Sequence, residues 1–253
     1  MVLQHFNLAG KTAIVTGCNT GLGQGMAVAL AQAGADVVGV NVSEPDETKA
    51  AVEALGRKFL DLRANLGDIS CIPDLVAQAK ALNGEVHILV NNAGIIRRED
   101  AIKFSEADWD DVMDLNLKSV FFLSQAVAKV FIAQGKGGKI INIASMLSFQ
   151  GGIRVPSYTA SKSGVMGITR LMANEWAAHG INVNAIAPGY MATNNTAQLR
   201  ADENRNAAIL ERIPAGRWGK PEDLAGPVVF LSSPASDYVN GYTIAVDGGW
   251  LAR

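Results

Sequence analysis

Residues 16–23 read Thr16-Gly17-Cys18-Asn19-Thr20-Gly21-Leu22-Gly23. A short apolar run ends at the start of this stretch, and an amphipathic, alanine-rich stretch follows from residue 22. Glycines permit a tight turn and close contact between backbone and ligand, and a helix N-terminus offers free N–H groups and the positive end of a dipole. The order strand, glycine loop, helix therefore predicts a turn that binds a dinucleotide pyrophosphate, although a simple packing turn would also use such glycines.

The rest of the chain repeats the alternation of short apolar runs and longer amphipathic stretches. Strands are predicted at residues 12–16, 36–41, 58–62, 87–91, 139–144, 182–187 and 243–246. Helices are predicted at residues 22–33, 47–55, 72–82, 106–133, 158–179, 197–212 and 221–232. Apolar strands that alternate with helices indicate a parallel sheet covered on both faces. We therefore expect an α/β fold, a doubly wound Rossmann-type parallel sheet of about seven strands, in a single dinucleotide-binding catalytic domain of residues 1–253.

Composition argues against several classes of function. The chain has 253 residues, 49% of them hydrophobic, and a formal net charge of −2, so it lacks the basic surface of a nucleic-acid or anionic-membrane binder. Its two cysteines imply no disulfide framework, and its histidines, His5, His87 and His179, are too far apart to suggest a metal site. We expect no signal peptide and no apolar run of membrane-spanning length. A cytoplasmic protein fits these features.

Tyr158 and Lys162 are the leading catalytic candidates by spacing. They lie four residues apart in a predicted helix and therefore share one face. A free phenol has a pKa of about 10, and a nearby ammonium group lowers that pKa by stabilising the phenolate. The pair predicts a proton-transferring phenol with an electrostatic helper; the alternative is an amphipathic helix with a surface lysine. Ser145 and Asn116, taken alone, would be a cap and a core polar group.

Four motifs in the right order resemble the short-chain dehydrogenase/reductase family. They are the glycine loop, Asn91-Asn92-Ala93-Gly94, Tyr158-x-x-x-Lys162, and Pro188-Gly189 with the closing Val246-Asp247-Gly248-Gly249. The resemblance implies hydride transfer at a hydroxyl or carbonyl carbon, with Tyr158 as general acid/base and Lys162 on the nicotinamide ribose. It also implies that Ser145 holds the reacting oxygen and that Asn116 orients a water beside Lys162.

The resemblance further implies NAD as the cofactor. The end of the second strand, where an acidic residue usually reads the adenosine ribose, carries Asn41. NADP-dependent relatives place Arg or Lys near that position or in the glycine loop, whereas this chain has Ser43 and Thr20. Asn65 matches the adenine-edge position and could equally cap the loop after its strand. The implied cofactor-binding residues are Gly17, Asn19, Thr20, Gly21, Leu22, Gly23, Asn41, Asn65, Leu66, Asn92, Ala93, Gly94, Tyr158, Lys162, Pro188, Gly189, Met191 and Thr193.

Polar residues at the same edge of the sheet point to an acidic sugar as substrate. Gln150 and Arg154 precede Tyr158, and Arg97 follows the Asn-Asn-Ala-Gly turn. Arginine pairs with carboxylates through two parallel hydrogen bonds. The expected substrate-binding residues are Arg97, Ser145, Gln150, Arg154 and Tyr158. The neighbouring Arg98 is expected to be a solvated surface charge.

Segments 89–100, 144–152 and 188–196 resemble family members that act on deoxy sugar acids. This implies interconversion of 2-dehydro-3-deoxy-D-gluconate and 3-deoxy-D-glycero-2,5-hexodiulosonate, a step in uronate and pectin breakdown. Residues 190–215 would form a mobile lid, and helices 106–133 and 158–179 match those through which family members pack into homotetramers. The alternatives are an NADPH-dependent 3-oxoacyl reductase, another polyol or gluconate dehydrogenase, and a non-catalytic dinucleotide-binding protein.

Overall fold

A parallel sheet of seven strands forms the centre of the molecule. The computed structural model describes residues 1–253, and its strands are β1 (Thr12–Thr16), β2 (Asp36–Asn41), β3 (Phe59–Arg63), β4 (Ile88–Asn91), β5 (Gly138–Ile143), β6 (Ile181–Pro188) and β7 (Thr243–Val246). They lie in the order β3-β2-β1-β4-β5-β6-β7, and every neighbouring pair is parallel. The predicted doubly wound parallel sheet is confirmed. Its strand order reverses between β1 and β4, and ligands of such sheets bind at the carboxyl ends of those strands.

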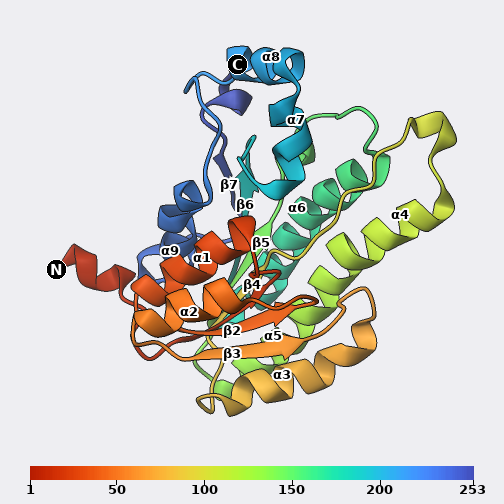
Figure 1. Cartoon of the computed structure of the whole chain (residues 1–253). Coiled ribbons are helices and arrows are strands. Elements are labelled where there is room, and N and C mark those ends of the chain that lie inside the picture. Colours follow the sequence, from red (N-terminus) through yellow and green to blue (C-terminus); the bar gives the residue numbers. More distant parts are fainter.

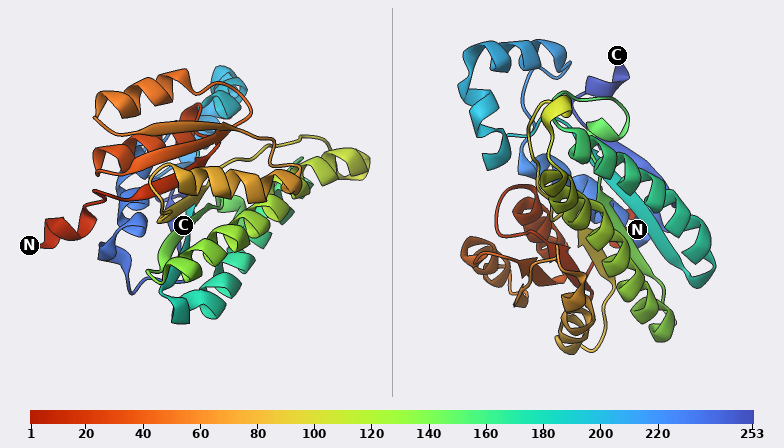
Figure 2. Two further views of the ribbon diagram at one scale, coloured as in Figure 1. Left: turned by 90° about the horizontal axis from the view of Figure 1, so that it is seen from below. Right: turned by 90° about the vertical axis from the view of Figure 1, so that its right-hand side faces the viewer.

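Helices cover both faces of this sheet, as Figure 2 shows from below in its left panel. One layer holds α1 (Gly21–Gln32), α2 (Asp46–Ala54) and α9 (Ala225–Ser232). The other layer holds α3 (Ile72–Ala81), α5 (Ser119–Gln134) and α6 (Pro156–Trp176). Side chains alternate along each strand, so Ala13 and Val15 of β1 pack on the first layer and Ile14 packs on the second. Burial on both faces explains why the strands are apolar along their whole length.

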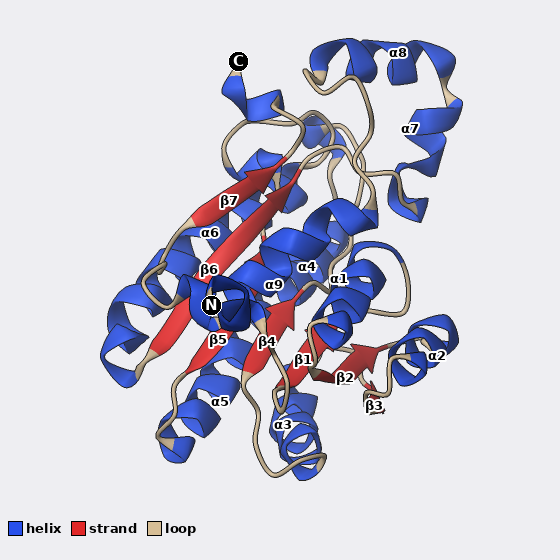
Figure 3. Ribbon diagram, turned by 90° about the vertical axis from the view of Figure 1, so that its left-hand side faces the viewer, coloured by secondary structure: helices blue, strands red, loops and turns tan.

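Two short helices, α7 (Ala197–Ala201) and α8 (Glu203–Arg212), lie at the carboxyl edge of the sheet. They form the upper end of the molecule in Figure 1, and the arrows of β6 and β7 point toward them in Figure 3. A single helix was predicted over 197–212, but the chain breaks at Asp202. The carboxylate of Asp202 accepts a hydrogen bond from the backbone N–H of Arg205 and starts a new helix there, which is the preferred role of aspartate at a helix N-terminus.

The predicted helix 106–133 is continuous but irregular. It consists of α4 (Glu106–Met113), a π-helical turn (Asp114–Lys118) and α5. Asn116 lies in that turn, where its amide bonds both the N–H and the carbonyl of Ile95. Isolated π turns are characteristic of functional sites, because the extra residue displaces the helix backbone. Hydrophobic periodicity predicted the helix but carries no sign of this turn.

The same helix corrects one expectation from composition. Over Glu106–Gln134 it is long and apolar enough, by length and composition, to cross a membrane, with a mean hydropathy of 1.3. Leu123, Val127 and Phe131 on its inner face belong to the core cluster beneath the sheet. In this fold the apolar side chains therefore serve as the contact surface of a core helix.

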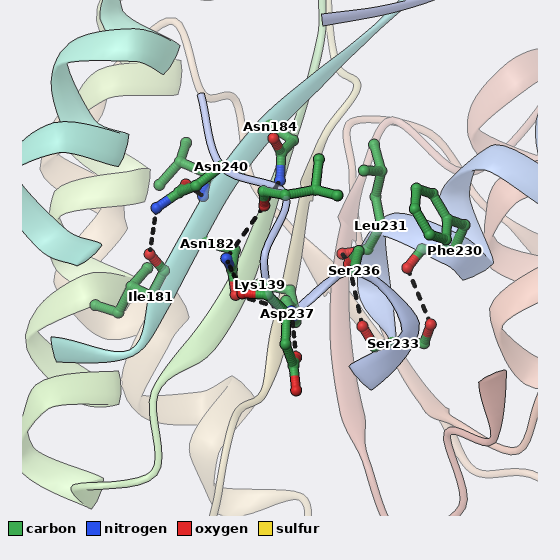
Figure 4. Close-up of polar contacts among 12 residues, drawn as sticks. Lys139, Ile181, Asn182, Asn184, Phe230, Leu231, Ser233, Ser236, Asp237 and Asn240 are labelled. Carbon is green, nitrogen blue, oxygen red and sulfur yellow. Dashed lines mark hydrogen bonds and ion pairs between the residues drawn. The ribbon is translucent and has the colours of Figure 1, made fainter. Parts of the chain in front are cut away.

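A polar network anchors the segment that leads into β7, as Figure 4 shows. The Lys139 ammonium group on β5 donates to Asn182 on β6 at 2.8 Å and to Asp237 at 2.7 Å. Asn184 donates to the backbone of the same segment, and the side chain of Asn240 accepts a hydrogen bond from the backbone of β6. Burial lowers the pKa of Lys139, and the contact with Asp237 opposes that shift. These contacts fix the last strand, and with it the C-terminal segment, on the sheet.

Candidate active site

One large cavity lies at the carboxyl edge of the sheet. Its volume is about 940 Å³, within the range of pockets that bind cofactors and substrates. The loops that follow the first six strands contribute to its wall, together with residues of the segment from Thr193 to Arg205. All of the cofactor-binding residues implied by the family resemblance line this cavity. Segments that are far apart in the sequence therefore meet at one site because parallel strands end at one edge.

The glycine loop leaves no room for a side chain at its centre. A Cβ atom at Gly23 would lie 2.1 Å from the carbonyl oxygen of Gly17 and 2.5 Å from the side-chain nitrogen of Asn92. Gly17 and Gly21 have φ values of 63° and 60°, a left-handed conformation that favours glycine. The loop thus brings backbone N–H groups to the start of α1, a twelve-residue helix. This arrangement fits the pyrophosphate of a dinucleotide, which needs backbone donors and the positive end of a helix dipole.

Asn92 connects the loop after β4 to the glycine loop. Its side-chain nitrogen donates to the carbonyls of Thr16 and Gly17 at 3.0 and 2.9 Å. In return, the Thr16 hydroxyl accepts hydrogen bonds from the backbone of Asn92 and Ala93. The Asn-Asn-Ala-Gly motif therefore holds the floor of the cavity in a fixed relation to the cofactor loop.

Asn41 lines the cavity at the end of β2 but uses its amide mainly within the protein. Its side-chain oxygen accepts from the backbone N–H of Cys18 at 2.8 Å, and its nitrogen lies 3.4 Å from the Asp61 carboxylate. Only 2% of the residue is exposed. Burial raises the pKa of the Cys18 thiol to about 11, so this thiol stays protonated at neutral pH. Asn65 lines the cavity too, while its side-chain oxygen accepts from Gly67 in a local turn.

The predicted catalytic residues Ser145, Tyr158 and Lys162 line the opposite end of the cavity. Ser145 follows β5, and α6 carries the other two on one face. The Lys162 ammonium group donates to the Ile143 carbonyl at 2.6 Å and lies 5.7 Å from the centre of the Tyr158 ring. Ser148, which sequence analysis did not single out, bonds the Lys162 carbonyl at 2.6 Å. Two backbone-anchored contacts therefore set the start of α6 against the end of β5 and the turn that follows it.

The electrostatics of Tyr158 differ from the sequence-based expectation. Desolvation raises the pKa of the Tyr158 phenol above its usual value, whereas the Ser145 hydroxyl and the Arg98 charge lower it. The ammonium group of Lys162 lies 5.7 Å from the centre of the Tyr158 ring, so its charge at neutral pH also favours the phenolate. Burial lowers the pKa of Lys162 itself to about 8. Arg98 is therefore a second cation that acts on the phenol, besides Lys162.

Asn116 does not line the cavity. It is fully buried, and its contacts run to the Ile95 backbone at 2.9 and 2.8 Å and to the Ser161 hydroxyl at 3.5 Å. The side chain thus holds the loop after β4 against α6, next to the residue that precedes Lys162. A role in orienting a water beside Lys162 stays a prediction.

Of the arginines near the cavity, Arg97 lies away from its predicted place. Arg97, expected to bind substrate, does not line the cavity, because Asp108 and Asp111 hold its guanidinium at 3.4 and 3.0 Å. Arg154 does line the cavity, as does Gln150. Arg98 lines it too; its side chain is exposed, as expected of a surface charge, and none of its atoms has a hydrogen-bond or ion-pair partner within the chain. Neighbouring residues of one loop alternate in direction, which composition alone does not reveal.

The segment after β6 closes the cavity above these residues. Pro188, Gly189, Met191 and Thr193 line it, followed by residues of α7 and α8. Among the latter is Arg205, which sequence analysis missed because it lies in a helix with no recognisable motif. The charged residues that line the whole cavity are Arg98, Arg154, Lys162, Asp202 and Arg205.

Comparisons with known proteins agree with this architecture. The family model described as "Enoyl-(Acyl carrier protein) reductase" matches residues 17–251. The chain is 76% identical to the 2-dehydro-3-deoxy-D-gluconate 5-dehydrogenase of Escherichia coli strain K12, over 100% of both chains. A solved protein of Agrobacterium tumefaciens with bound NADP is 59% identical, with a TM-score of 0.92 over 98% of this chain and 99% of that one. A gluconate 5-dehydrogenase from Burkholderia cenocepacia J2315, solved with NADP and tartrate, is 36% identical, with a TM-score of 0.94 over 100% of both chains.

The matched range contains every motif on which the sequence-based resemblance rests. It begins at Gly17 in the glycine loop and extends past the closing Gly248-Gly249. The curated relative matches over its full length, and the solved neighbours share the fold from end to end. The chain therefore belongs to the short-chain dehydrogenase/reductase family of dinucleotide-binding oxidoreductases, and it acts on a CH–OH group.

Proposed function

We propose that the protein is an NAD(H)-dependent dehydrogenase that interconverts 2-dehydro-3-deoxy-D-gluconate and 3-deoxy-D-glycero-2,5-hexodiulosonate. The observation that carries this proposal is Arg98, a guanidinium that lines the same cavity as Tyr158 and has no partner within the chain. A sugar carboxylate would pair with it through two charge-assisted hydrogen bonds. The name of the Escherichia coli relative supports the same substrate. Tartrate, present in the Burkholderia structure, is also a hydroxy acid.

Tyr158 is the general acid/base in this proposal. In oxidation, the phenolate takes the proton of the substrate hydroxyl as the same carbon loses its hydride and the C=O bond forms. A bound nicotinamide dinucleotide supplies the hydride acceptor, or the donor in the reverse reaction. Ser145 donates a hydrogen bond to the reacting oxygen, and Gln150 contacts the sugar hydroxyls. Because oxidation uses the phenolate, its kcat/KM rises as the pH passes the pKa of Tyr158, and kcat/KM for reduction falls.

Cofactor choice follows from the end of the cavity that extends from the glycine loop to Asn65, where the adenosine would bind and which we call the adenosine end. Around Asn41, Val42 and Asn65 no lysine or arginine lines the wall, so a 2′-phosphate would find no cation there. NAD is therefore the proposed cofactor, although three solved neighbours hold NADP. Asn41 repels a phosphate less strongly than a carboxylate would, so the preference for NAD is expected to be moderate.

Residues 190–215 are proposed to close over the substrate, within one catalytic domain of residues 1–253. Supporting this, Thr193, Asn194 and Leu199 line the cavity from above. On the inner side, Ile209 and Ile213 of this segment pack with Trp250 near the C-terminus. The residues that pack on Trp250 would stay in place as the hinge, and the rest of the segment would close as a lid that excludes water from the reacting atoms.

The proposed assembly is a homotetramer in the cytoplasm, acting in uronate and pectin breakdown. Phe122 and Ile132 on α5 and Leu171 on α6 are 37%, 43% and 47% exposed, which leaves apolar surface that subunit contacts could cover. Both cysteines are free thiols, as expected in a reducing compartment. Light scattering coupled to size-exclusion chromatography tests the assembly, and a monomer at micromolar concentration would contradict it.

Steady-state kinetics with purified protein test the proposed reaction. We expect kcat/KM with NADH and 3-deoxy-D-glycero-2,5-hexodiulosonate to exceed the value with NADPH. It should also exceed the values for gluconate-derived ketones and for 3-oxoacyl thioesters. Arg98→Ala should raise KM for the sugar acid by about 10- to 100-fold, the worth of a charge-assisted hydrogen bond, and change KM for a neutral polyol little. Turnover of acyl thioesters above that of every sugar acid would overturn the proposal.

A further inference from the structure

Arg154 combines a strained backbone with an unusual set of contacts. It is the single residue other than glycine in the chain with a left-handed φ, at 63°. This conformation is unfavourable for a residue with a Cβ atom and persists only where the surrounding structure imposes it. Arg154 lies two residues before Pro156, the first residue of α6, the helix that carries Tyr158. A strained residue at the start of the catalytic helix indicates a functional constraint.

The contacts of Arg154 run to the loop that carries Arg98. Its guanidinium lies 3.1 Å from the Asp100 carboxylate and 3.9 Å from the Glu99 carboxylate. Its carbonyl oxygen accepts a hydrogen bond from the backbone N–H of Glu99 at 3.1 Å. The backbone and the side chain of Arg154 therefore both bind the loop after β4, at Glu99 and Asp100.

The other end of the same loop is also fixed. Arg97 pairs with Asp108 and Asp111 on α4. Arg98 lies between these two anchors, lines the cavity and has no partner in the chain. Both neighbours of Arg98 are thus held, while its own guanidinium is left for a ligand. Such an arrangement presents one charge in a defined direction.

We propose that Arg154 is a positioning residue that fixes Arg98 relative to Tyr158 through Glu99 and Asp100. The inference rests on the proposed function, in which Arg98 binds the substrate carboxylate. Under this assignment Arg98 binds the carboxylate and Tyr158 contacts the reacting hydroxyl. Arg154 sets the distance between these two side chains. Arg154 then contributes to specificity without touching the substrate, in contrast to the direct contact that sequence analysis expected.

A double-mutant cycle tests whether Arg154 acts through Arg98. Arg154→Ala should raise KM for the sugar acid about tenfold, a smaller effect than Arg98→Ala, with kcat changed less. In the Arg98→Ala background, Arg154→Ala should add no further increase in KM, because the group it positions is already gone. Multiplicative increases would mean that Arg154 binds the carboxylate directly and would overturn the proposal.

Titration of Tyr158 gives a readout that needs no substrate. Ultraviolet difference absorbance of the protein without added dinucleotide, with Tyr158→Phe subtracted, follows the phenol. The charged side chains that line the cavity are Arg98, Lys162, Arg154, Asp202 and Arg205. Of these charges, that of Arg98 lowers the pKa of Tyr158. Arg98→Ala and Arg154→Ala should both raise that pKa, and the double variant should match Arg98→Ala. Unchanged titration in Arg154→Ala, with only thermal stability reduced, would reduce Arg154 to a structural role.

Three further variants complete the design. Arg154→Gly removes the ion pairs but relaxes the backbone, so it should reproduce the KM and titration effects of Arg154→Ala with less loss of stability. Asp100→Asn weakens the same contact if neither Arg154 variant folds. Lys136→Ala, which breaks an exposed ion pair with Glu85 far from the cavity, should change neither readout. If the sugar acid is not a substrate but the titration shifts persist, the proposed function fails and the coupling of Arg154 to Arg98 stands.

Discussion

The two ends of the cavity differ in the chemistry of the residues that line them. The adenosine end, from the glycine loop to Asn65, is lined by backbone, amides and small side chains and carries no charged side chain. All five charged lining residues lie at the other end. Lys162 belongs to α6, Arg98 and Arg154 lie in two loops, and Asp202 and Arg205 lie at the start of α8. The first end recognises a ligand by close approach and a helix dipole, and the second by charge. Substitutions should therefore act through steric overlap at one end and through electrostatics at the other.

The largest effect is expected at the charged end, from Tyr158→Phe. Removing the phenolic oxygen eliminates the proton carrier, so kcat should fall by about 10²- to 10⁴-fold. The ring stays in place, so calorimetric binding of the dinucleotide should change little. A variant that keeps more than a tenth of the wild-type kcat would show that another group transfers the proton.

Gly23→Ala tests the steric character of the adenosine end. The new methyl group would lie 2.1 Å from the Gly17 carbonyl oxygen, so the loop must open and dinucleotide affinity should fall by about 100-fold or more. Gly226→Ala is the matched control, since a Cβ atom there meets nothing within 4 Å. That control, in α9, should bind normally and be slightly more stable. Equal affinities of the two variants would refute the steric account.

Lys162→Met should trade activity for stability. Burial lowers the pKa of Lys162 to about 8, so at pH 7 the folded protein carries a desolvated charge that the unfolded chain holds in water. Removing it should stabilise the protein without added dinucleotide by about 1–2 kcal/mol at pH 7, after allowing for the lost bond to Ile143. The unfolded lysine keeps its proton to about pH 10.5, whereas the folded one loses it above about 8, so the gain should shrink between those values. Urea unfolding at pH 7 and pH 10 measures the stabilisation and its change with pH. A stabilisation that increases with pH would contradict the prediction.

Asn41→Asp should produce the smallest effect. The carboxylate keeps the acceptor for the Cys18 N–H but faces Asp61, 3.4 Å from the present amide nitrogen. Repulsion of the 2′-phosphate should weaken NADPH binding about three- to tenfold, with NADH affinity nearly unchanged. Fluorescence titration of both dinucleotides tests this, and an equal loss for both would mean that Asn41 serves only to anchor the loop.

Much of the catalytic end was accessible from the sequence, but three of its five charged lining residues, Arg98, Asp202 and Arg205, were not. The spacing of Tyr158 and Lys162 placed both on one helix face, and the structure brings Ser145 beside them. Arg97 was predicted as a substrate contact, yet of these two neighbours only Arg98 lines the cavity, because the two arginines are the same residue type and differ only in which acids lie nearby. Asp108 and Asp111 on α4 occupy Arg97, and no local pattern records that contact.

The sequence by itself determined the elements, their order and the glycine loop. These depend on local and periodic properties: strands apolar on both faces, helices with one apolar face, and Gly17 and Gly21 where φ is positive. Only the tertiary structure decided which charge faces the cavity, where Asp202 divides the last lid helix, and why Arg154 is strained. Those features arise from contacts between residues distant in sequence, such as Arg154 with Asp100, which leave no periodic trace in the sequence.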